Sequence, residues 1–462
     1  MDKQVVFGEQ WITARFPDDR THVVPAGGID LPLSPVEDLA GAVRAALARP
    51  LDRPPLREMA RPGWRVTVAF DDPTVPCYAP VWETAIPVIL EELGRAGVER
   101  RRVTLLCANA VHRKFTPAEL ARILGEPLAQ EFADRLLCND AEDPENLVHL
   151  GKTARGHDVE LNRLVADSDL TIYVNTSCTR GFSGGWKSVC VGLATWRSIR
   201  WHHTPDIMSM SLEHNPLHEI LDEMGALVEA RLGAERIFKM ETVLANPFQV
   251  AHLWTGSIPA TRQAALKVLK AHHVARRDML AEKADIVCYG IPNWSPYASF
   301  SIMNPILTLI STGLGYLGGV IEALGKPGCS VILATPCPDQ WNEVHHPSYR
   351  EVWQRVLAES RDPYEIMERY EAEFSTRADY IAKYRHAYGF HPAHSLMATH
   401  PLKRLRHAAQ VIVAGIGEPR LARHLGFEAA SSVEEAIVLA EARHGKAASI
   451  AFVPYPMAFS RM

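Results

Sequence analysis

The sequence lacks the marks of a secreted or membrane-spanning protein. Its eight cysteines are scattered and form no CxxC pair, which argues against a disulfide framework and favours reduced thiols. The first residues, Met1-Asp2-Lys3-Gln4, contain no apolar signal-peptide core. No apolar run is expected to reach the roughly 18 residues that a membrane span needs. We therefore expect a cytoplasmic protein without a membrane partner.

Concentrated positive charge is also missing. The chain has 49 Lys and Arg residues against 54 Asp and Glu residues, which gives a formal net charge of −5. The densest basic run, Arg100-Arg101-Arg102, fits a solvated connection before a strand, so no nucleic-acid partner is expected. With 462 residues, of which 47% are hydrophobic, the chain is long enough for two or three domains with sizeable cores.

What is present is a repeated alternation of strands and helices, which predicts an α/β fold. The expected strands are 65–70, 102–107, 169–174, 285–289, 329–334, 410–414 and 448–454. We predict two doubly wound, mostly parallel α/β domains, 1–268 and 269–462. We expect the active site in a cleft between them, because parallel strands present their carboxyl-terminal loops at one edge. The loops expected there are 72–76, 108–113, 175–187 and 292–300.

A glycine-rich segment, Gly181-Phe-Ser-Gly-Gly-Trp-Lys187, follows one of these strands. Without Cβ atoms, Gly184 and Gly185 let backbone N–H groups approach an anion, and Lys187 supplies a charge or a nucleophilic amine. A phosphate loop of the G-x-x-x-x-G-K-[ST] type would need glycine where Trp186 stands, so a nucleoside triphosphatase is disfavoured. An ordinary connection with a solvated lysine is the competing interpretation.

Two histidines and an Asp-Pro-Thr segment are further candidates. His112 ends a predicted strand, where an imidazole can act as a general acid or base. His203 is of a type that binds nickel, copper or zinc, but no HExxH or Cys/His cluster accompanies it, so a cofactor would have to supply the other ligands. Asp72 and Thr74 could bind a sugar or phosphate, or they could stabilise the turn around Pro73. For each histidine a structural role stays open, because the chain has twenty.

These residues resemble the nickel-pincer nucleotide-dependent lactate racemase family. The pattern GFSGGxK at 181–187, with His203 sixteen residues after the lysine, is the most specific part of the resemblance. The segments DPTxP at 72–76 and VHR at 111–113 resemble other motifs of that family, and so does His214-Asn215-Pro216. The second half of the chain resembles the family more loosely.

The resemblance implies a cofactor, an enzyme class and partners. The cofactor would be the nickel-pincer nucleotide, a pyridinium-3-thioamide-5-thiocarboxylate mononucleotide, covalently attached to Lys187. His203 would be the fourth nickel ligand, and His112 would exchange the hydroxyl proton of a 2-hydroxy acid while hydride moves between substrate and cofactor. Cofactor-maturation enzymes would be partners. The residues expected near the nucleotide are Asp72, Thr74, Ser183, Gly184 and Gly185.

The chain departs from the family pattern on the substrate side. Ser177, with Cys178 beside it, stands where the family has its second acid/base histidine, and Val75 replaces the arginine that grips the substrate. Arg180 could supply the lost positive charge. The family's YQxxK signature is absent from 292–304, a segment that holds Trp294 and Tyr297, which are kept as further substrate candidates.

The sequence therefore predicts a nickel-dependent racemase or epimerase of a 2-hydroxy acid other than lactate. Two alternatives stay open. One is a protein that carries the pincer cofactor in a dehydrogenase-like or non-catalytic role. The other is a phosphate-binding transferase that uses Gly184, Gly185 and Lys187. The oligomeric state is not indicated by the sequence.

Overall fold

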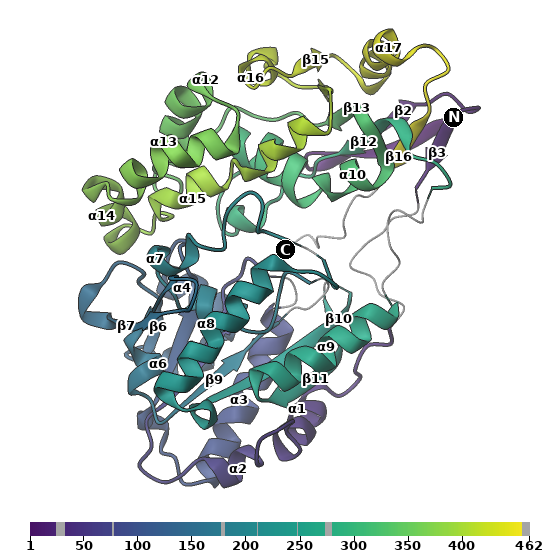
Figure 1. Cartoon of the computed structure of the whole chain (residues 1–462). Helices are drawn as coiled ribbons and strands as arrows, with labels where there is room; N and C mark the ends of the chain where they lie inside the picture. The colour runs from purple at the N-terminus through teal and green to yellow at the C-terminus, as the bar shows by residue number, and fades with distance from the viewer. Residues whose placement is uncertain are drawn as a thin grey trace. The chain divides into compact units, whose positions relative to one another are not determined.

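The chain folds into two compact α/β units. The computed structural model describes residues 1–24, 33–75, 78–176, 181–209, 211–246, 248–272 and 280–454. The unit that we call N-terminal contains Ile29–His273 and Ile381–His391 (Figure 1). The C-terminal unit contains Met1–Gly28, Val274–Tyr380 and Pro392–Met462.

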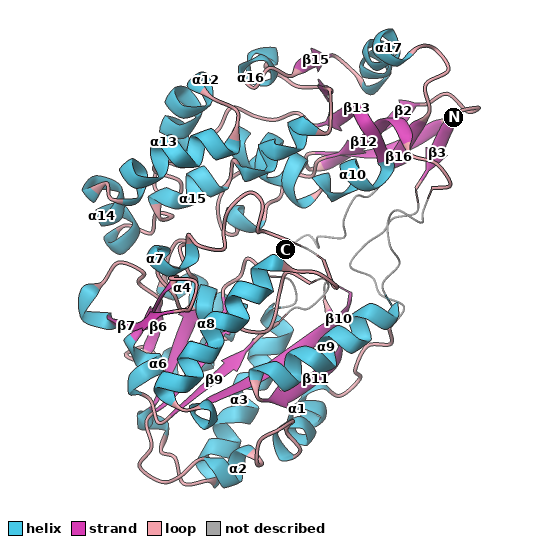
Figure 2. Ribbon diagram, in the orientation of Figure 1, coloured by secondary structure: helices cyan, strands magenta, loops and turns pink. Residues whose placement is uncertain are grey.

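The N-terminal unit is built on a six-stranded sheet (Figure 2). Its order is β11-β10-β9-β4-β5-β6, and every neighbouring pair is parallel except β10 with β11. β9 is buried along its whole length, as expected of a parallel strand covered on both faces. The predicted first three strands are confirmed to within one residue. The strands are β4 (Val66–Asp71), β5 (Val103–Ala108), β6 (Leu136–Cys138), β9 (Leu170–Val174), β10 (Ile237–Asn246) and β11 (Gln249–Gly256).

Helices pack against this sheet, with α3 in contact with β4 and β9, and α9 in contact with β10 and β11. Local sequence sets their starts: Thr116 and Glu119 form a capping box at α4, and Asn215 caps α8. The helices are α1 (Leu39–Ala48), α2 (Leu56–Met59), α3 (Tyr78–Arg95), α4 (Pro117–Leu124), α5 (Glu126–Glu131), α6 (Arg163–Asp167), α7 (Trp196–Ile199), α8 (Pro216–Leu232) and α9 (Ile258–His272). A hairpin of β7 (Leu147–Lys152) and β8 (Asp158–Asn162) completes the unit.

The C-terminal unit has a second six-stranded sheet, parallel throughout, in the order β15-β14-β13-β12-β16-β3. Its strands are β3 (Thr21–Val23), β12 (Ala284–Gly290), β13 (Gly325–Ala334), β14 (Gln410–Ala414), β15 (Glu428–Ala430) and β16 (Ile450–Val453). A hairpin of β1 (Asp2–Phe7) and β2 (Gln10–Arg15) belongs to the same unit.

The division differs from a single cut at 268/269. β3 pairs with β16, with Thr21 opposite Ile450, so the first residues of the chain lie in the C-terminal unit. Conversely, the helix α14 (Ala378–His386) starts in the C-terminal unit and ends in the N-terminal one. The remaining helices of the C-terminal unit are α10 (Ile321–Leu324), α11 (Tyr349–Glu351), α12 (Leu357–Glu359), α13 (Pro363–Ser375), α15 (Pro392–Met397), α16 (Pro419–His424) and α17 (Val433–His444).

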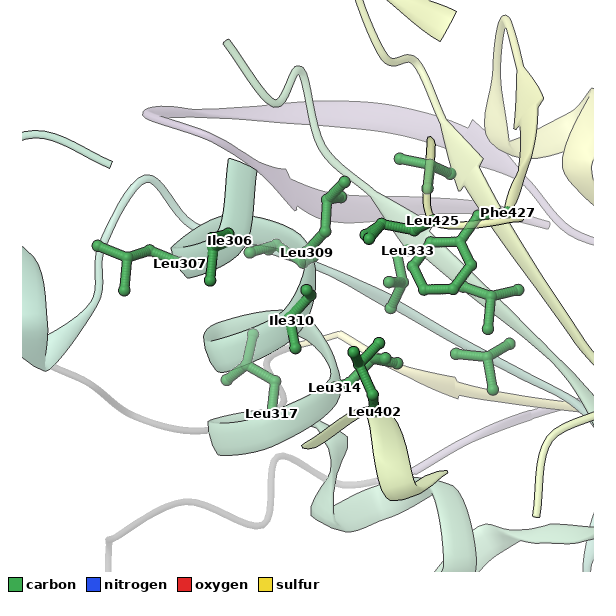
Figure 3. Close-up of a cluster of buried hydrophobic side chains, with 14 of the residues drawn as sticks. Ile306, Leu307, Leu309, Ile310, Leu314, Leu317, Leu333, Leu402, Leu425 and Phe427 are labelled. Carbon is green, nitrogen blue, oxygen red and sulfur yellow. The ribbon is translucent and has the colours of Figure 1, made fainter. Parts of the chain in front are cut away.

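The expectation that no apolar segment is long enough to cross a membrane is wrong for one helix. Ile306–Leu324 has the length and composition of a span, but 72% of its most apolar stretch is buried inside the fold. It begins with the π-helical segment Ile306–Tyr316. Figure 3 shows its side chains beside those of Leu333 and Phe427. This burial is that of a core helix in a parallel α/β unit.

Candidate functional site

His112 and Asp72 meet at the ends of two neighbouring parallel strands. β4 ends at Asp71 and β5 at Ala108, so the residues that follow lie at one edge of the sheet. Nδ1 of His112 lies 2.7 Å from Oδ2 of the buried Asp72. A carboxylate in this position accepts the Nδ1 proton and fixes the tautomer of the ring. The other oxygen of Asp72 accepts from the backbone N–H of Thr74 at 3.3 Å and from its hydroxyl at 2.5 Å.

The loop that carries His112 is held by the second half of α14 and by the residues that follow this helix. Ala110 has a left-handed φ of 49°, and its carbonyl accepts from the hydroxyl of Tyr384 at 3.1 Å. The backbone N–H of His391 donates to the carbonyl of Val111 at 3.1 Å. The ring of Phe390 packs against the imidazole of His112, with centroids 5.7 Å apart. Residues 381–391 therefore form one wall around His112.

Arg113, the arginine of the VHR segment, has a structural role. Its side chain is 1% exposed and forms a two-point ion pair with Glu119, with nitrogen–oxygen distances of 2.7 and 3.0 Å. Its guanidinium also lies 4.5 Å from the ring centre of Phe115. The pair ties the His112 loop to the first turn of α4.

Asp71, directly before Asp72, forms a second, partly buried carboxylate site. It accepts hydrogen bonds from the hydroxyl of Tyr173 at 2.7 Å, from the amide of Asn175 at 2.9 Å and from the backbone N–H of Thr176 at 2.9 Å. Burial raises the pKa of Asp71 despite these hydrogen bonds and the nearby charges of Lys239 and Lys187. The carboxyl therefore lies within electrostatic reach of the lysine that the sequence singles out.

The glycine loop, residues 181–187, is held through its own backbone by side chains of α8, β10 and α9. The carbonyl of Gly181 accepts from Asn215 at 3.0 Å and from Arg262 at 2.7 Å. Arg262 also donates to the carbonyl of Ser183. The carbonyls of Gly181 and Ser183 are thus bound by side chains from α9 and from the N-cap of α8.

His218 of α8 binds the carbonyl of Phe182, which lies between those of Gly181 and Ser183 in the loop. Its Nε2 atom donates to the carbonyl of Phe182 at 3.1 Å, and burial, followed by the charge of Arg262, lowers the pKa of His218 to about 3. Gly184 and Gly185 have left-handed φ angles of 86° and 57°. A Cβ at Gly185 would lie 3.2 Å from Cδ of Arg262 and 3.4 Å from Nδ1 of His218, so both the angle and the space require glycine there.

A fully buried ion pair on β10 binds the backbone carbonyl and N–H of Gly185. Lys239 and Glu241 are both 0% exposed, and their charged groups lie 3.0 Å apart. Lys239 donates to the carbonyl of Gly185 at 2.8 Å, and the N–H of Gly185 donates to the Glu241 carboxylate at 3.2 Å. We call Asn215, His218, Lys239, Glu241 and Arg262 the loop-binding cluster. Because the Gly185 N–H is bound to a carboxylate, it is not directed at an incoming anion.

Trp186 and Lys187 point to different environments. Trp186 is 2% exposed, and its indole covers Gly225 of α8 so closely that a Cβ there would overlap the ring. The bulky side chain that breaks the phosphate-loop pattern is thus a core anchor. Lys187 is only partly buried, and its ammonium lies 4.5 Å from the ring centre of Phe182.

His203 lies directly after a second buried imidazole. Nδ1 of His202 and Nδ1 of His203 are 2.7 Å apart, and the two residues are 0% and 8% exposed. Burial, followed by the charge of Lys187, lowers the pKa of His202 to about 3. Since Nδ1 of His203 is bound to its neighbour, a metal ion at this imidazole would bind at Nε2.

Five further residues were predicted for the substrate side. Ser177, Cys178 and Arg180 lie outside the described residues. Tyr297 belongs to the C-terminal unit, where its hydroxyl accepts from Tyr316 at 2.8 Å. Trp294, in the same unit, accepts at its carbonyl from Thr312 at 3.5 Å. Their substrate role stays a prediction.

Sequence reasoning missed Asp71 at the end of β4 and, around the glycine loop, the buried side chains of His218, Lys239, Glu241 and Arg262. A signal existed for two of them: β10 reads IFKMETVLAN, and lysine and glutamate two residues apart on one face of an otherwise apolar strand indicate a buried pair. The contribution of residues 381–391 had no sequence signal, because it depends on tertiary structure alone.

The described residues fit the cofactor that the resemblance implies. Among them, no three His, Cys, Asp or Glu side chains gather to hold a metal ion, so nickel at His203 needs its other ligands from a bound group. Imidazole is a suitable ligand for nickel. Lys187 follows a loop whose backbone is fixed by the loop-binding cluster, which suits a single covalent attachment point.

Comparisons with known proteins find lactate racemases among the relatives of this chain. Residues 7–214 match the lactate racemase N-terminal domain family. A lactate racemase from Lactiplantibacillus plantarum is 24% identical over 421 residues, which cover 89% of this chain and 88% of that protein. A lactate racemase from Thermoanaerobacterium thermosaccharolyticum is 24% identical over 377 residues, which cover 79% of each.

Solved structures share the fold along almost the whole chain. The lactate racemase apoprotein from Thermoanaerobacterium thermosaccharolyticum matches with a TM-score of 0.70 at 19% identity, and covers 99% of this chain and 98% of its own. A protein from Thermotoga maritima matches with a TM-score of 0.56 at 15% identity, over 90% and 96%. The predicted pair of α/β domains is therefore confirmed, and the sequence matches support a lactate racemase-like family for this chain.

Proposed function

We propose that the chain is a nickel-pincer-dependent racemase or epimerase of a 2-hydroxy acid other than lactate. Lys187 is the attachment point of the cofactor, His203 is its protein ligand to nickel, and His112 exchanges the substrate's hydroxyl proton. The observation that carries the proposal is the Asp72–His112 pair, at 2.7 Å, in the same unit as the fixed loop that ends at Lys187. Similarity to two lactate racemases over most of the chain supports the isomerase class.

The chemistry of the Asp72–His112 pair follows from its hydrogen bond. With the Nδ1 proton donated to Asp72, the ring accepts and returns a proton at Nε2, and the buried carboxylate stabilises the imidazolium that forms. When bound, the cofactor supplies the hydride acceptor for C2 of the substrate. His112 then removes the hydroxyl proton as C2 is oxidised and returns it as C2 is reduced, which is general acid/base work.

The lysine is held for attachment by the residues around it. The loop-binding cluster fixes the backbone before Lys187, and Trp186 in the core sets the direction of the chain at this point. A covalent bond therefore forms without ordering a mobile loop, so little conformational entropy is lost. The phosphate-binding alternative receives less support, because the N–H of Gly185 is bound to Glu241.

The surroundings of His112 favour a substrate with an apolar substituent. Phe390 packs against the imidazole, and Val75, which follows the Asp72 turn, brings no charge. A longer aliphatic or aromatic substituent also buries more apolar area on binding than the methyl group of lactate does. The substrate class we propose is therefore 2-hydroxy acids with larger apolar side chains.

Mass spectrometry and isotope exchange test the proposal together. The protein is produced with cofactor-maturation enzymes, and its intact mass and nickel content are measured. We expect one added mass at Lys187 and one nickel ion per chain. A panel of enantiopure 2-hydroxy acids is then incubated with the loaded protein in isotopically labelled water. We expect the configuration at C2 to racemise without uptake of the solvent label at C2. An unmodified protein mass without nickel would reject the proposed cofactor. A loaded protein that racemises none of the acids tested would instead support the alternative that the chain carries the cofactor without acting as a racemase.

A further inference from the structure

The turn that carries His112 has a backbone conformation that its residues do not favour. The N–H of His112 donates to the carbonyl of Asn109 at 2.7 Å, which closes a β-turn over residues 109–112. The second residue of this turn, Ala110, has a φ of 49°. A left-handed φ at that position normally takes glycine, because a Cβ crowds the backbone there. Contacts from outside the turn must therefore offset this cost.

Three groups from outside the turn hold the backbone of Ala110. Its N–H donates to the carbonyl of Gly192 at 2.9 Å. Its carbonyl accepts from the hydroxyl of Tyr384 at 3.1 Å and from the side-chain amide of Asn139 at 3.5 Å. The Tyr384 hydroxyl is therefore the closer donor to this carbonyl, whose peptide group leads directly towards His112.

The donor role of the Tyr384 hydroxyl follows from its own partners. The side chain is 0% exposed, and burial holds the pKa of the phenol well above the usual range, so the hydroxyl keeps its proton. Its oxygen accepts from the backbone N–H of Ala141 at 2.9 Å. The one hydroxyl proton goes to a carbonyl, which can only accept. The carbonyl of Ala110, at 3.1 Å, is closer than that of Asn139, at 3.5 Å.

We infer that Tyr384 is a positioning residue for His112. Its hydroxyl holds the Ala110 carbonyl and so keeps the turn in the conformation that presents the imidazole to Asp72. The ring of Tyr384 has a separate packing role, edge-to-face against His391 with centroids 5.3 Å apart. This positioning belongs to the protein without its cofactor, whereas its consequence for proton exchange rests on the proposed function.

The first test reads the hydrogen bond between His112 and Asp72 in the cofactor-free protein. Histidine labelled with ¹⁵N is incorporated, and the Nδ1–H signal of His112 is assigned from its loss in His112→Gln. Because a carboxylate only accepts, wild type should show this Nδ1–H signal. Tyr384→Phe removes one oxygen and keeps the ring. We expect it to weaken or abolish the signal, because the turn relaxes and the imidazole leaves the carboxylate.

Glycine at position 110 provides the decisive comparison. It adopts a left-handed φ without strain, so the turn no longer needs the hydroxyl. The double variant, Tyr384→Phe with Ala110→Gly, should therefore recover the Nδ1–H signal that Tyr384→Phe alone loses. The matched control is Tyr380→Phe, which removes a hydroxyl one turn earlier on α14. That hydroxyl donates to Glu351 at 2.5 Å, and its loss should leave the His112 signal as in wild type.

The second test measures the reaction of the loaded protein. Single-turnover reduction of the cofactor is followed over a range of concentrations of an acid that wild type racemises. We expect Tyr384→Phe to lower the maximal rate by about 10- to 100-fold, the scale for a catalytic group displaced by about 1 Å. The concentration for half-maximal rate should change by less than about 3-fold, because Tyr384 acts on the turn and not on ground-state binding. The double variant should recover most of the rate.

The outcomes separate this inference from the proposed function. An Nδ1–H signal that is absent in wild type, or equally strong in Tyr384→Phe, overturns the inference whatever the cofactor proves to be. A signal that Ala110→Gly does not recover overturns it as well, because the hydroxyl then does not act through the strained turn. A full single-turnover rate in His112→Ala rejects the proposed role of His112, while the NMR comparison still decides the role of Tyr384.

Far-UV circular dichroism shows whether each variant is folded. If Tyr384→Phe is too unstable to study alone, the double variant carries the test. A folded double variant with the Nδ1–H signal supports the inference, since glycine then replaces the function of the hydroxyl. A double variant that also fails to fold contradicts it.

Discussion

Replacing Lys239 by methionine should test whether the buried pair on β10 supports the glycine loop. The ammonium group is fully buried, lies 3.0 Å from Glu241 and donates to the Gly185 carbonyl at 2.8 Å. Methionine fills a similar volume but leaves a buried carboxylate without its main partner and a backbone carbonyl without its donor. Removing one partner of a buried ion pair costs about 3–5 kcal/mol. Arg262, 3.9 Å from Glu241, offsets part of this, so we expect about 3 kcal/mol.

The double variant gives the decisive comparison. Glu241→Gln alone keeps an acceptor for the Gly185 N–H but leaves Lys239 buried without a counter-ion, so it should also cost about 3–5 kcal/mol. Lys239→Met with Glu241→Gln removes both charges, and the main remaining defect is the Gly185 carbonyl, at about 1–3 kcal/mol. The double variant should therefore be more stable than the sum of the single effects by about 3 kcal/mol or more.

Urea unfolding followed by tryptophan fluorescence and far-UV circular dichroism provides the free energies, with equal slopes required for comparison. The same variants are then loaded with cofactor, because a displaced loop should slow attachment at Lys187 even where the protein stays folded. Additive destabilisation, with the double variant no better than the sum, would refute the view that the two charges act as one buried pair.

Three further predictions follow from the site. Lys187→Ala should abolish the added cofactor mass, whereas His203→Ala should keep the mass and lose nickel, as read by intact-mass and metal analysis. His112→Ala should lower single-turnover reduction of the loaded cofactor by at least about 10²-fold, and Asp72→Asn should lower it in the same assay while the adduct remains. His218→Gln should make the free energy of unfolding less dependent on pH at acid pH. The pKa of His218 in the folded protein, about 3, lies below its value in the unfolded chain, so wild type loses about 1.4 kcal/mol of stability per pH unit as the pH falls below about 6.5. Glutamine still donates to the Phe182 carbonyl but does not titrate.

The sequence was sufficient to predict the parts of the site that depend on strand ends. In a parallel sheet the carboxyl ends of neighbouring strands meet at one edge, so Asp72 after one strand and His112 after the next could be expected near each other. Their direct hydrogen bond could not be predicted, because the register of β4 against β5 decides it. The turn role of Asp72 toward Thr74 and its contact with His112 occur together, one on each carboxylate oxygen.

Other parts depend on segments that are distant in sequence. Tyr384, Phe390 and His391 surround the His112 loop but come from a piece of chain far beyond the expected domain boundary. No local pattern marks a segment whose role is to leave one unit and pack in the other. The first residues of the chain, in turn, belong to the C-terminal unit, because β3 pairs with β16 in the second sheet.

The glycine loop shows why the same residues can be mistaken for an anion site. Glycine permits close approach of a backbone, but the approaching group need not be a ligand. At Gly185 the groups in contact are Arg262, His218 and the Lys239–Glu241 pair, all from the protein itself. A loop whose amide and carbonyls are bound internally holds the next side chain in one position. Under the proposed function, in which a cofactor is attached through the amine of Lys187, that rigidity is the useful property, and Trp186 in the core is part of it rather than a defect in a phosphate loop.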